Sequence, residues 1–424
     1  MRKSLLEIAI NEREVIVDEV FGIKREELAE KLKLAAASRA EECISFLKDI
    51  ISIPSPSGQE KAVAERIVAE MKKVGFDEAF TDRAGNAVGR FGNGYTHILC
   101  DAHIDTVTPD KTWKHDPYSP RLEDGVLYGL GACDDKGPLA SLVYGVRLMR
   151  DLGLSGDYTV WVVGAVSEEI GEGFGVKSFL EETGVKPAYA VISEASSLVP
   201  KRGHKGRAML EVVIEGRSVH ASTPELGENP IYKAVPIIDA ISKMGPTLRG
   251  DEFIGKGTIV VTRVDCPSPS LNTIPSECVL YLDRRLTLGE DQKTIIEEVK
   301  GLKAVSETPG VSVRLMGFEQ PCYTGLTLKG EEFFPAWAIP EDHPLVAATV
   351  LSVEIAMGRK VTPDKWDFCT DGAFTMGVAA IPTIGFGPGD GKYAHSPDDQ
   401  IEVRQVIEAA SVFAILPGIL ASRQ

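Results

Sequence analysis

The middle of the chain contains a run of about 110 residues whose predicted elements follow the order β-α-β-β-α-β. Strands are predicted from short Val- and Ile-rich runs bounded by Gly, Pro or Asp, and helices from apolar residues that recur every three to four positions. The predicted strands are 208–215, 258–264, 277–286 and 311–316, and the predicted helices are 229–243 and 291–302. This order is the split, ferredoxin-like unit, which is complete in itself. We therefore expect residues 206–316 to be a domain inserted into a larger one.

The segments on both sides of this insertion alternate between strands and helices, which is typical of an α/β sheet with helices on both faces. The predicted strands are 87–91, 96–101, 158–165 and 188–193, and the predicted helices include 137–152, 173–183 and 403–419. We assign residues 39–205 and 317–424 to this discontinuous α/β domain. Functional groups in such folds lie in the loops beyond the strand ends.

Residues 1–38 are charged and helix-prone, and we expect them to form a helical extension packed on the surface of the α/β domain. Within 24–37, the side chains of Leu28, Leu32 and Ala35 fall on one face of a helix. A further helix is predicted at 40–51, and another at 59–74.

The charge balance excludes several classes of partner. The 62 acidic residues outnumber the 46 basic ones, and a net charge of −16 disfavours binding to phosphate backbones, so we expect no nucleic-acid partner. No apolar run approaches the roughly 20 residues of a membrane-spanning helix, and acids interrupt the first apolar run too early for a secretory signal. The seven cysteines are scattered and odd in number, which favours reduced thiols in a cytoplasmic enzyme.

Two motifs could bind metal ions. The first lies at the end of a predicted strand, and the second lies directly before a predicted helix. The first, Asp101-Ala102-His103-Ile104-Asp105-Thr106-Val107, ends a strand, and a carboxylate at Asp105 can hold the second ring nitrogen of His103. The second, Gly131-Ala132-Cys133-Asp134-Asp135-Lys136-Gly137, offers adjacent carboxylates in a glycine-rich turn, where one carboxylate can bridge two cations. Taken singly, each motif is also consistent with an ordinary polar contact at a strand end or with acids at a helix N-terminus.

Three further segments place acids or a histidine at predicted strand ends. Ser167-Glu168-Glu169 follows the most apolar strand, and paired acids there could supply one metal ligand and one general base. Ser193-Glu194-Ala195 closes another apolar strand, and Tyr393-Ala394-His395-Ser396-Pro397-Asp398 follows a glycine-rich loop. Acid pairs are more often solvated surface groups, so the combination of all five segments in one domain carries the inference.

The order of these five segments resembles the di-zinc aminoacylase/carboxypeptidase family, which includes acetylornithine deacetylase, succinyl-diaminopimelate desuccinylase, glutamate carboxypeptidase and carnosinase. The resemblance extends from about residue 46 to the C-terminus and includes the insertion. Within the family, the sequence is most similar to that of a branch labelled selenium-metabolism-linked hydrolases. The resemblance implies a mixed-sheet zinc-peptidase catalytic domain with an inserted ferredoxin-like domain that serves as lid and dimerisation domain.

The resemblance also implies a role for each residue of the five segments. His103 and His395 would each bind one metal ion, and Asp134 would bridge the two, with a cis peptide bond after it. Each metal ion would bind one further carboxylate. Of two other acids, one would orient a metal-binding histidine and the other would act as the general base. These four residues are Glu169 and Glu194 as ligands, Asp105 as the orienting group of His103, and Glu168 as the base.

In the insertion, Gly216-Arg217-Ser218-Val219-His220 resembles the family segment whose histidine reaches a neighbouring active site across a homodimer. Asn272 and Arg285 lie in segments similar to those that hold the substrate carboxylate, although a surface ion pair is an alternative for Arg285. Thr370 and Asp371 are also expected to line the pocket, although the sequence around them departs from that of the better-known members.

A set of two imidazoles and three carboxylates suits two Zn²⁺ ions, with Co²⁺ or Mn²⁺ as alternatives. The implied reaction is hydrolysis of an amide bond in a small substrate that carries a carboxylate, through a bridging hydroxide and the base Glu168. Glutamate at position 194 favours removal of an acyl or carbamoyl group from an N-acyl amino acid, and a dipeptidase or carboxypeptidase is the alternative. A non-catalytic, metal-dependent binder is the alternative from another class, but such a protein would have no need of Glu168.

Overall fold

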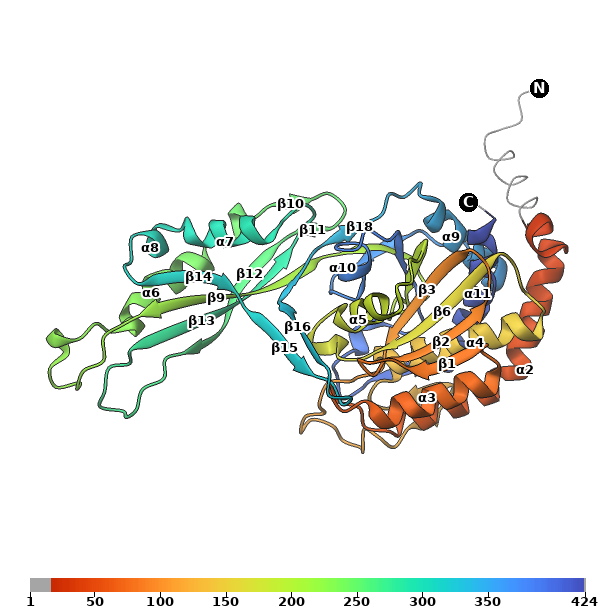
Figure 1. Ribbon diagram of the computed structural model, residues 1–424, viewed down its shortest axis with the longest axis horizontal. Coiled ribbons are helices and arrows are strands. Elements are labelled where there is room, and N and C mark those ends of the chain that lie inside the picture. Colours follow the sequence, from red (N-terminus) through yellow and green to blue (C-terminus); the bar gives the residue numbers. More distant parts are fainter. Residues whose placement is uncertain (1–16, 423–424) are drawn as a thin grey trace, which may run out of the picture.

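A computed structural model describes residues 17–422 of the chain, so residues 1–16 of the predicted N-terminal extension lie outside the described residues. The molecule has two parts that lie side by side along its long axis (Figure 1). The larger part is built on a nine-stranded mixed sheet, and the smaller part is built on a five-stranded sheet. This is the α/β fold with an inserted domain that the sequence predicts.

Four parallel strands occupy the centre of the large sheet in the order β6, β3, β7 and β20. They are β3 (Thr96–His103), β6 (Tyr158–Ala165), β7 (Tyr189–Ile192) and β20 (Thr383–Gly385). Because they are parallel, their carboxyl ends meet at one edge of the sheet. Every residue of β6 is buried, which explains its unbroken run of apolar side chains.

Antiparallel strands flank this centre. On one side lie β2 (Ala87–Gly92) and β1 (Glu78–Thr81), and on the other β8 (Lys201–His204) and β18 (Trp337–Ala338). The remaining short strands of the larger part are β19 (Asp364–Trp366), which pairs with β8, and the three-stranded group β4 (Arg121–Glu123), β5 (Val126–Tyr128) and β21 (Gln400–Glu402).

Helices cover both faces of the large sheet. One face carries the main apolar core, to which α2 (Arg25–Ile51), α3 (Lys61–Val74), α4 (Gly137–Asp151), α9 (Pro344–Met357) and α11 (Val403–Ala421) contribute. The other face packs on α5 (Phe174–Thr183) through a smaller cluster that includes Trp161 and Phe179, and α10 (Gly372–Thr375) lies beside α5. Helix α11 is long and apolar enough to cross a membrane, but 72% of its most apolar window is buried inside the protein, as in a core helix.

The N-terminal helices differ from the prediction. The sequence predicts two helices, at 24–37 and 40–51, whereas α2 is one continuous helix through both. No Gly or Pro stands between them, and Ser38 and Arg39 do not break a helix whose flanking turns are well packed. Leu28 and Leu32 are buried as predicted, while the buried alanine is Ala36, one position after Ala35.

The inserted sheet has the strand order β12-β13-β9-β14, and each neighbouring pair is antiparallel. Its strands are β9 (Gly206–Glu215), β12 (Thr258–Asp265), β13 (Glu277–Leu286) and β14 (Val311–Leu315). Its helices are α6 (Pro230–Ser242), α7 (Gln292–Lys300) and α8 (Lys303–Ser306), and a small hairpin adds β10 (Gly250–Asp251) and β11 (Gly255–Lys256). Alternate residues of β9 are buried, as expected for a sheet with helices on one face.

The chain passes between the two parts more than once. It leaves the large sheet after β8 and enters the inserted sheet at β9. It returns through the hairpin β15 (Gly317–Pro321) and β16 (Thr327–Glu331), then through β17 (Phe333–Phe334), which pairs with β9, and finally through β18, which pairs with β8. These crossings include residues 202–207 and 314–318.

The cysteines depart from the expectation of seven reduced thiols. Cys266 and Cys278 form a disulfide bond, and the five other cysteines are free and buried. The register of β12 and β13 pairs Asp265 with Val279, so the next residues along, the two cysteines, face each other. This pairing depends on strand register, which the spacing of cysteines in the sequence does not reveal.

Candidate active site

A cavity of about 410 Å³ lies between the two parts of the molecule, at the carboxyl edge of the central strands. Residues from both parts line it. The larger part contributes Asp134, Glu168, Glu169, Glu172, Glu194, Ala195, Phe368, Cys369, Gly391, Ala394 and His395, and the inserted part contributes Arg207 and Arg285. Five of the residues that the sequence indicates as metal ligands or base are therefore brought to one cavity, and a sixth, His103, lies beside it.

The carboxylate of Asp134 stands between the two histidines. Its Oδ1 lies 2.8 Å from Nε2 of His103, and its Oδ2 lies 3.3 Å from Nε2 of His395. The peptide bond between Asp134 and Asp135 is cis, as the resemblance implies. Each oxygen of one carboxylate thus faces a different imidazole nitrogen, an arrangement that suits a ligand shared by two cations.

Each histidine has one further carboxylate close by. Oε2 of Glu169 lies 2.7 Å from Nε2 of His395, and Oε1 of Glu194 lies 3.8 Å from Nε2 of His103. Glu169 follows β6, and His395 lies in the loop before β21. Glu194 follows β7, and His103 is the last residue of β3. Two sets of one imidazole and one carboxylate, with Asp134 between them, are the donors expected for a two-metal site.

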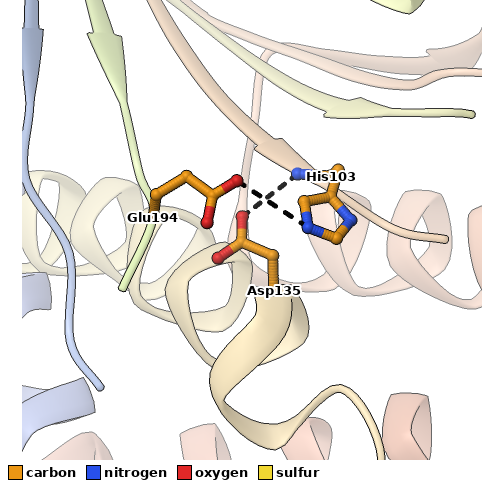
Figure 2. A group of neighbouring side chains, drawn as sticks. All are labelled: His103, Asp135 and Glu194. Carbon is orange, nitrogen blue, oxygen red and sulfur yellow. Dashed lines mark hydrogen bonds and ion pairs between the residues drawn. The ribbon is translucent and has the colours of Figure 1, made fainter. Parts of the chain in front are cut away.

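Asp135 lies close to His103 and Glu194 and forms a second group of possible ligands with them (Figure 2). However, its Oδ2 accepts a hydrogen bond from the backbone N–H of His103 at 3.1 Å. Its Oδ1 is buried without a hydrogen-bond partner among the described residues, and burial raises the pKa of this carboxyl well above its ordinary value. We therefore interpret Asp135 as a residue that supports the backbone at the end of β3, rather than as a metal ligand.

The ring of His103 is held from behind by Asp105. Nδ1 lies 2.9 Å from the backbone carbonyl oxygen of Asp105 and 3.5 Å from its Oδ1. With Nδ1 donating to the carbonyl, Nε2 carries the free lone pair that faces the cavity. Asp105 thus lies where the sequence predicts an orienting group, and its nearest contact is through the backbone.

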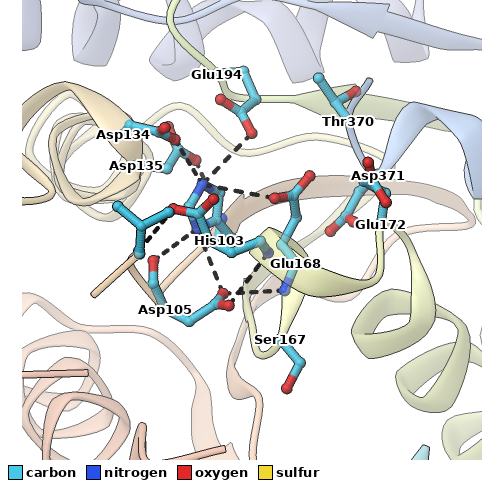
Figure 3. A network of polar contacts seen from close by, with 12 residues as sticks. His103, Asp105, Asp134, Asp135, Ser167, Glu168, Glu172, Glu194, Thr370 and Asp371 are labelled. Atoms are coloured by element: carbon cyan, nitrogen blue, oxygen red, sulfur yellow. Dashed lines mark hydrogen bonds and ion pairs between the residues drawn. The ribbon is translucent and has the colours of Figure 1, made fainter. Parts of the chain in front are cut away.

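The carboxylate of Asp105 also ties down the loop that carries the predicted base. Oδ1 accepts a hydrogen bond from the N–H of Glu168 at 3.1 Å, and Oδ2 accepts from the N–H of Glu169 at 3.3 Å and from Oγ of Ser57 at 2.6 Å. Oε2 of Glu168 lies 4.0 Å from Nε2 of His103 (Figure 3). The candidate base is therefore next to the proposed metal ligands but is not one of them.

The electrostatics of this group indicate missing positive charge. Among the described residues, the ion-pair partners of Asp134, Glu168, Glu169 and Glu194 are the two histidines, and no Lys or Arg pairs with any of them. Burial, aggravated by neighbouring carboxylates, raises the pKa of Glu168 and of Glu194 well above the ordinary value for glutamate. Two divalent cations would neutralise this buried acidic cluster, so the donor set fits a two-metal centre by charge as well as by geometry.

Of the three residues that the sequence assigns to the insertion, only Arg285 lines the cavity. His220 and Asn272 contact each other instead, with Nε2 of His220 3.3 Å from Nδ2 of Asn272, in the exposed loops that follow β9 and β12. Neither contributes to the cavity of this single chain. The Nδ1 of His220 contacts the hydroxyl of Ser222 at 2.7 Å.

Several contacts of the site have no counterpart in the sequence predictions. Arg207 and Glu172 form an ion pair in the cavity wall, and Asp101 is hydrogen-bonded to Asp371 beneath it. Burial raises the pKa of Asp101 well above its ordinary value, so its carboxyl donates a proton to this contact. Asp101 sits in the first predicted motif, but nothing in the sequence indicates that Asp371, some 270 residues later, lies against it.

The chain matches the model of Peptidase family M20/M25/M40 over residues 99–417. Over 374 residues it is 38% identical to the protein YgeY of Escherichia coli (strain K12), an alignment that covers 88% of this chain and 93% of YgeY. It is 28% identical over 335 residues to acetylornithine deacetylase of Proteus mirabilis (strain HI4320), which covers 75% of this chain and 78% of that enzyme.

Among solved structures, the fold is similar to that of the Bacillus subtilis YXEP protein, a dinuclear metal binding peptidase from the M20 family. The TM-score is 0.67 at 16% identity, and the match covers 91% of this chain and 99% of that structure. The family match, the curated relatives and the arrangement of acids and histidines agree, and the chain is a metal-dependent hydrolase that belongs to the peptidase family M20/M25/M40.

Proposed function

We propose that this hydrolase cleaves the amide bond of an N-acyl or N-carbamoyl amino acid by means of two metal ions. The observation that carries the proposal is Asp134, whose two carboxylate oxygens face Nε2 of His103 and Nε2 of His395. Beside this pair stands Glu168, a buried carboxyl that forms no salt bridge with a Lys or Arg among the described residues. The combination supports a two-metal centre with a general base at its border.

The five ligands in this proposal divide into two sets. His103 and Glu194 would hold one ion, His395 and Glu169 the other, and Asp134 both. Two imidazoles with three carboxylates suit Zn²⁺, and Co²⁺ or Mn²⁺ are alternatives. When bound, the two cations would polarise the amide carbonyl and lower the pKa of water so that it attacks near neutral pH.

Glu168 would handle the protons of the reaction. It accepts a proton from the attacking water and returns it to the leaving nitrogen, which needs a carboxyl whose pKa lies nearer neutrality than that of a solvated glutamate. Burial raises the pKa of Glu168 in that direction. The N–H of Glu168 is fixed to Asp105, so the base is held in place while its side chain faces the cavity.

Arg285 would recognise the carboxylate of the substrate. Its guanidinium lines the cavity from the inserted part and is paired with Asp283 at 2.9 and 3.1 Å, both from β13. A planar fork of N–H donors matches the geometry of a carboxylate. The position of Arg285 opposite the metal-ligand group supports a substrate with an amide at one end and a carboxylate at the other.

We further propose a homodimer through the inserted part, in which His220 and Asn272 would serve the neighbouring active site. Within residues 17–422, the edge strand β12 has no strand partner on one side, and it exposes Val260 and Val264. Helix α6, which packs beside it, exposes Tyr232 and Val235. Unpaired strand edges with apolar side chains are suited to association. Substituting Val260 by Asp would turn such a dimer into monomers, as measured by analytical ultracentrifugation.

Two alternatives differ in substrate or in kind. A dipeptidase would use the same residues on a peptide bond, and the segment Asp134-Asp135-Lys136-Gly137-Pro138 resembles that of family dipeptidases. A non-catalytic binder would keep the metals and the arginine but have no use for Glu168. We also propose that the enzyme acts in the cytoplasm, a compartment in which its five free, buried cysteines would stay reduced.

The deciding experiment is a hydrolysis screen of the purified protein loaded with Zn²⁺, Co²⁺ or Mn²⁺. The panel contains N-acetyl and N-carbamoyl amino acids, dipeptides and amino-acid amides that lack a free carboxylate. We expect cleavage of acyl amino acids and a loss of roughly 10²- to 10⁴-fold in Glu168→Gln, with two metal ions per chain retained. Cleavage of dipeptides alone would favour the dipeptidase, and no cleavage of any compound would favour the binder.

A further inference from the structure

The ion pair between Arg207 and Glu172 joins the inserted part of the molecule to the loop that carries the predicted base. Arg207 is the second residue of β9, directly after the chain has crossed from the large sheet. Glu172 follows Glu168 by four residues in the larger part. Both side chains line the cavity, so this contact forms part of the wall around the space in which the substrate would lie.

The contact has the geometry of a strong, directional pair. Nε of Arg207 donates to Oε1 of Glu172 at 2.8 Å, and Nη2 donates to Oε2 at 2.6 Å. Two parallel hydrogen bonds fix both the distance and the angle between a guanidinium and a carboxylate, whereas a single bond leaves rotation free. The exposed fractions of the two side chains are only 16% and 10%, so solvent screens the pair weakly.

The surroundings immobilise the pair from both ends. On the arginine side, the guanidinium lies over the ring of Phe334 at 4.9 Å, and Nη1 contacts Oε2 of Glu332 at 3.3 Å. On the glutamate side, the N–H of Gly173 donates to Asp371, which is itself hydrogen-bonded to Asp101 under the site. The backbone next to Glu172 is thus anchored, in the same loop that carries Glu168 (Figure 3).

Arg207 also neighbours the predicted carboxylate-binding arginine. In the register of β9 and β13, Arg207 lies directly opposite Arg285. Directly paired residues point to the same face of a sheet, and both of these side chains reach the cavity. Whatever fixes Arg207 against the larger part therefore fixes the position of Arg285 relative to Glu168.

We propose that Arg207 is a positioning residue, which through its paired hydrogen bonds to Glu172 holds Arg285 of the inserted part at a set distance from Glu168 and the metal ligands. The substrate carboxylate and the scissile amide are bound by different parts of the molecule, so their spacing depends on this contact. The proposal rests on the proposed function only for its effect on hydrolysis; the positioning itself is a property of the chain.

The chain offers a matched pair of variants that separates this role from general packing. Glu172→Gln removes the negative charge and one of the two hydrogen bonds between the two parts, because an amide has a single acceptor oxygen. Glu332→Gln removes the other carboxylate of the same arginine. Glu332 lies between β16 and β17, and among the described residues no hydrogen bond or ion pair joins it to the loop of Glu168. Arg207→Lys keeps the charge and loses the paired geometry.

The direct test measures the distance between the two parts by pulsed electron paramagnetic resonance, without substrate. Nitroxide labels are placed on Tyr95→Cys in the larger part and Lys303→Cys in the inserted part, two exposed positions, while the five free native cysteines are buried. Mixing with unlabelled protein removes signals between subunits. We expect one narrow distance population in the otherwise unmodified protein and in Glu332→Gln, and a broadened distribution in Glu172→Gln and Arg207→Lys.

Steady-state kinetics then test the consequence, with the N-acetyl amino acid that the screen identifies as the fastest substrate. Because a small misplacement of reacting groups is costly, we expect kcat of Glu172→Gln to fall about 10- to 100-fold with KM changed less than about threefold and two metal ions per chain retained. Glu332→Gln should stay within about twofold of the unmodified protein.

Each outcome decides the proposal. Unchanged distances in Glu172→Gln, or equal broadening in Glu172→Gln and Glu332→Gln, would overturn it, as would an Arg207→Lys protein that matches the unmodified one. If Arg207→Lys fails to fold, the comparison of the two glutamate variants still decides. If no amide is hydrolysed, the proposed function fails while the distance measurement stands on its own.

Discussion

Nδ1 of His103 lies 2.9 Å from the backbone carbonyl oxygen of Asp105, closer than the 3.5 Å to the carboxylate Oδ1 of the same residue. The carboxylate instead accepts hydrogen bonds from the backbone N–H groups of Glu168 and Glu169 and from Ser57. One residue thus holds a predicted metal ligand with its backbone and the loop of the predicted base with its side chain.

This division predicts an unusual result for Asp105→Asn. The backbone carbonyl remains, so His103 keeps its orientation and the protein should still bind two metal ions. The side-chain amide has a single acceptor oxygen, so part of the support of the Glu168 loop is lost, and we expect hydrolysis to fall about 10- to 100-fold. Metal analysis together with kcat/KM checks this; a variant that loses metal but keeps its rate per bound metal would show that the carboxylate serves the histidine alone.

His395→Ala should remove one metal ion and leave the other. His395 contacts Glu169 and Asp134 but none of the other proposed ligands, whereas His103 contacts Asp134 and Glu194. We expect metal analysis to fall from two ions per chain to one, with hydrolysis lost. His115→Ala, in an exposed loop, is the control and should retain two ions. Retention of both ions by His395→Ala would remove this residue from the ligand set.

A buried carboxyl beneath the site predicts how stability varies with pH. Glu60 is fully buried, its Oε1 accepts from the N–H groups of Gly58 and Ser167, and burial raises its pKa from 4.5 to about 7. Because the folded state binds the proton more tightly than the unfolded state, the stability from the protonated carboxyl is present below pH 4.5 and is lost as the pH rises to about 7.

Glu60→Gln should abolish the loss of stability that accompanies ionisation of the Glu60 carboxyl at higher pH. Relative to the unmodified protein, we expect its free energy of unfolding to be similar near pH 5 and higher at pH 8, by at most about 3 kcal/mol. Urea unfolding at both pH values measures the difference. Glu65→Gln, an exposed position on α3, which begins directly after Glu60, should show no such dependence. A Glu60→Gln protein that is equally destabilised at both pH values would refute the assignment.

The disulfide predicts a redox-dependent stability of the inserted part. Cys266 and Cys278 are separated by 12 positions, and closing a loop of this size stabilises a fold by about 3 kcal/mol in the chain-entropy model. Replacing both cysteines by Ser should lower the free energy of unfolding by about 2–3 kcal/mol in the absence of reductant. In the presence of a dithiol reductant, the free energy of unfolding of the unmodified protein should fall to nearly that of the variant. If the difference in free energy persists under reduction, the effect is due to packing and not to the disulfide bond.

Much of the framework is legible in the sequence because it depends on local pattern. Strands such as β6 and β13 begin and end at the predicted residues, since their apolar runs are bounded by turn residues. The order of elements in the insertion gives its topology, because a split β-α-β-β-α-β chain has few ways to close into one sheet. The convergence of the acid and histidine segments follows from parallel strands whose carboxyl ends share an edge.

Other features depend on contacts between distant segments, which local pattern does not encode. The Asp101–Asp371 contact and the Arg207–Glu172 pair join residues far apart in the chain, and single acids or arginines carry no periodic signal. The register that faces Cys266 with Cys278 is likewise set by the whole sheet. The continuity of α2 shows the opposite case, in which packing extends a helix across residues of ordinary propensity.

The neighbouring strands β7 and β20 have a consequence for the order of events during folding. They are hydrogen-bonded partners at the centre of the large sheet, yet the whole inserted part lies between them in the chain. Contacts of such high sequence separation form late, and the inserted unit, whose contacts are local, can fold before them. Glu194 follows β7 and His395 lies beyond β20, so the nascent chain carries no complete pair of cation sites. We therefore expect the ion at His395 to bind only after the sheet is complete.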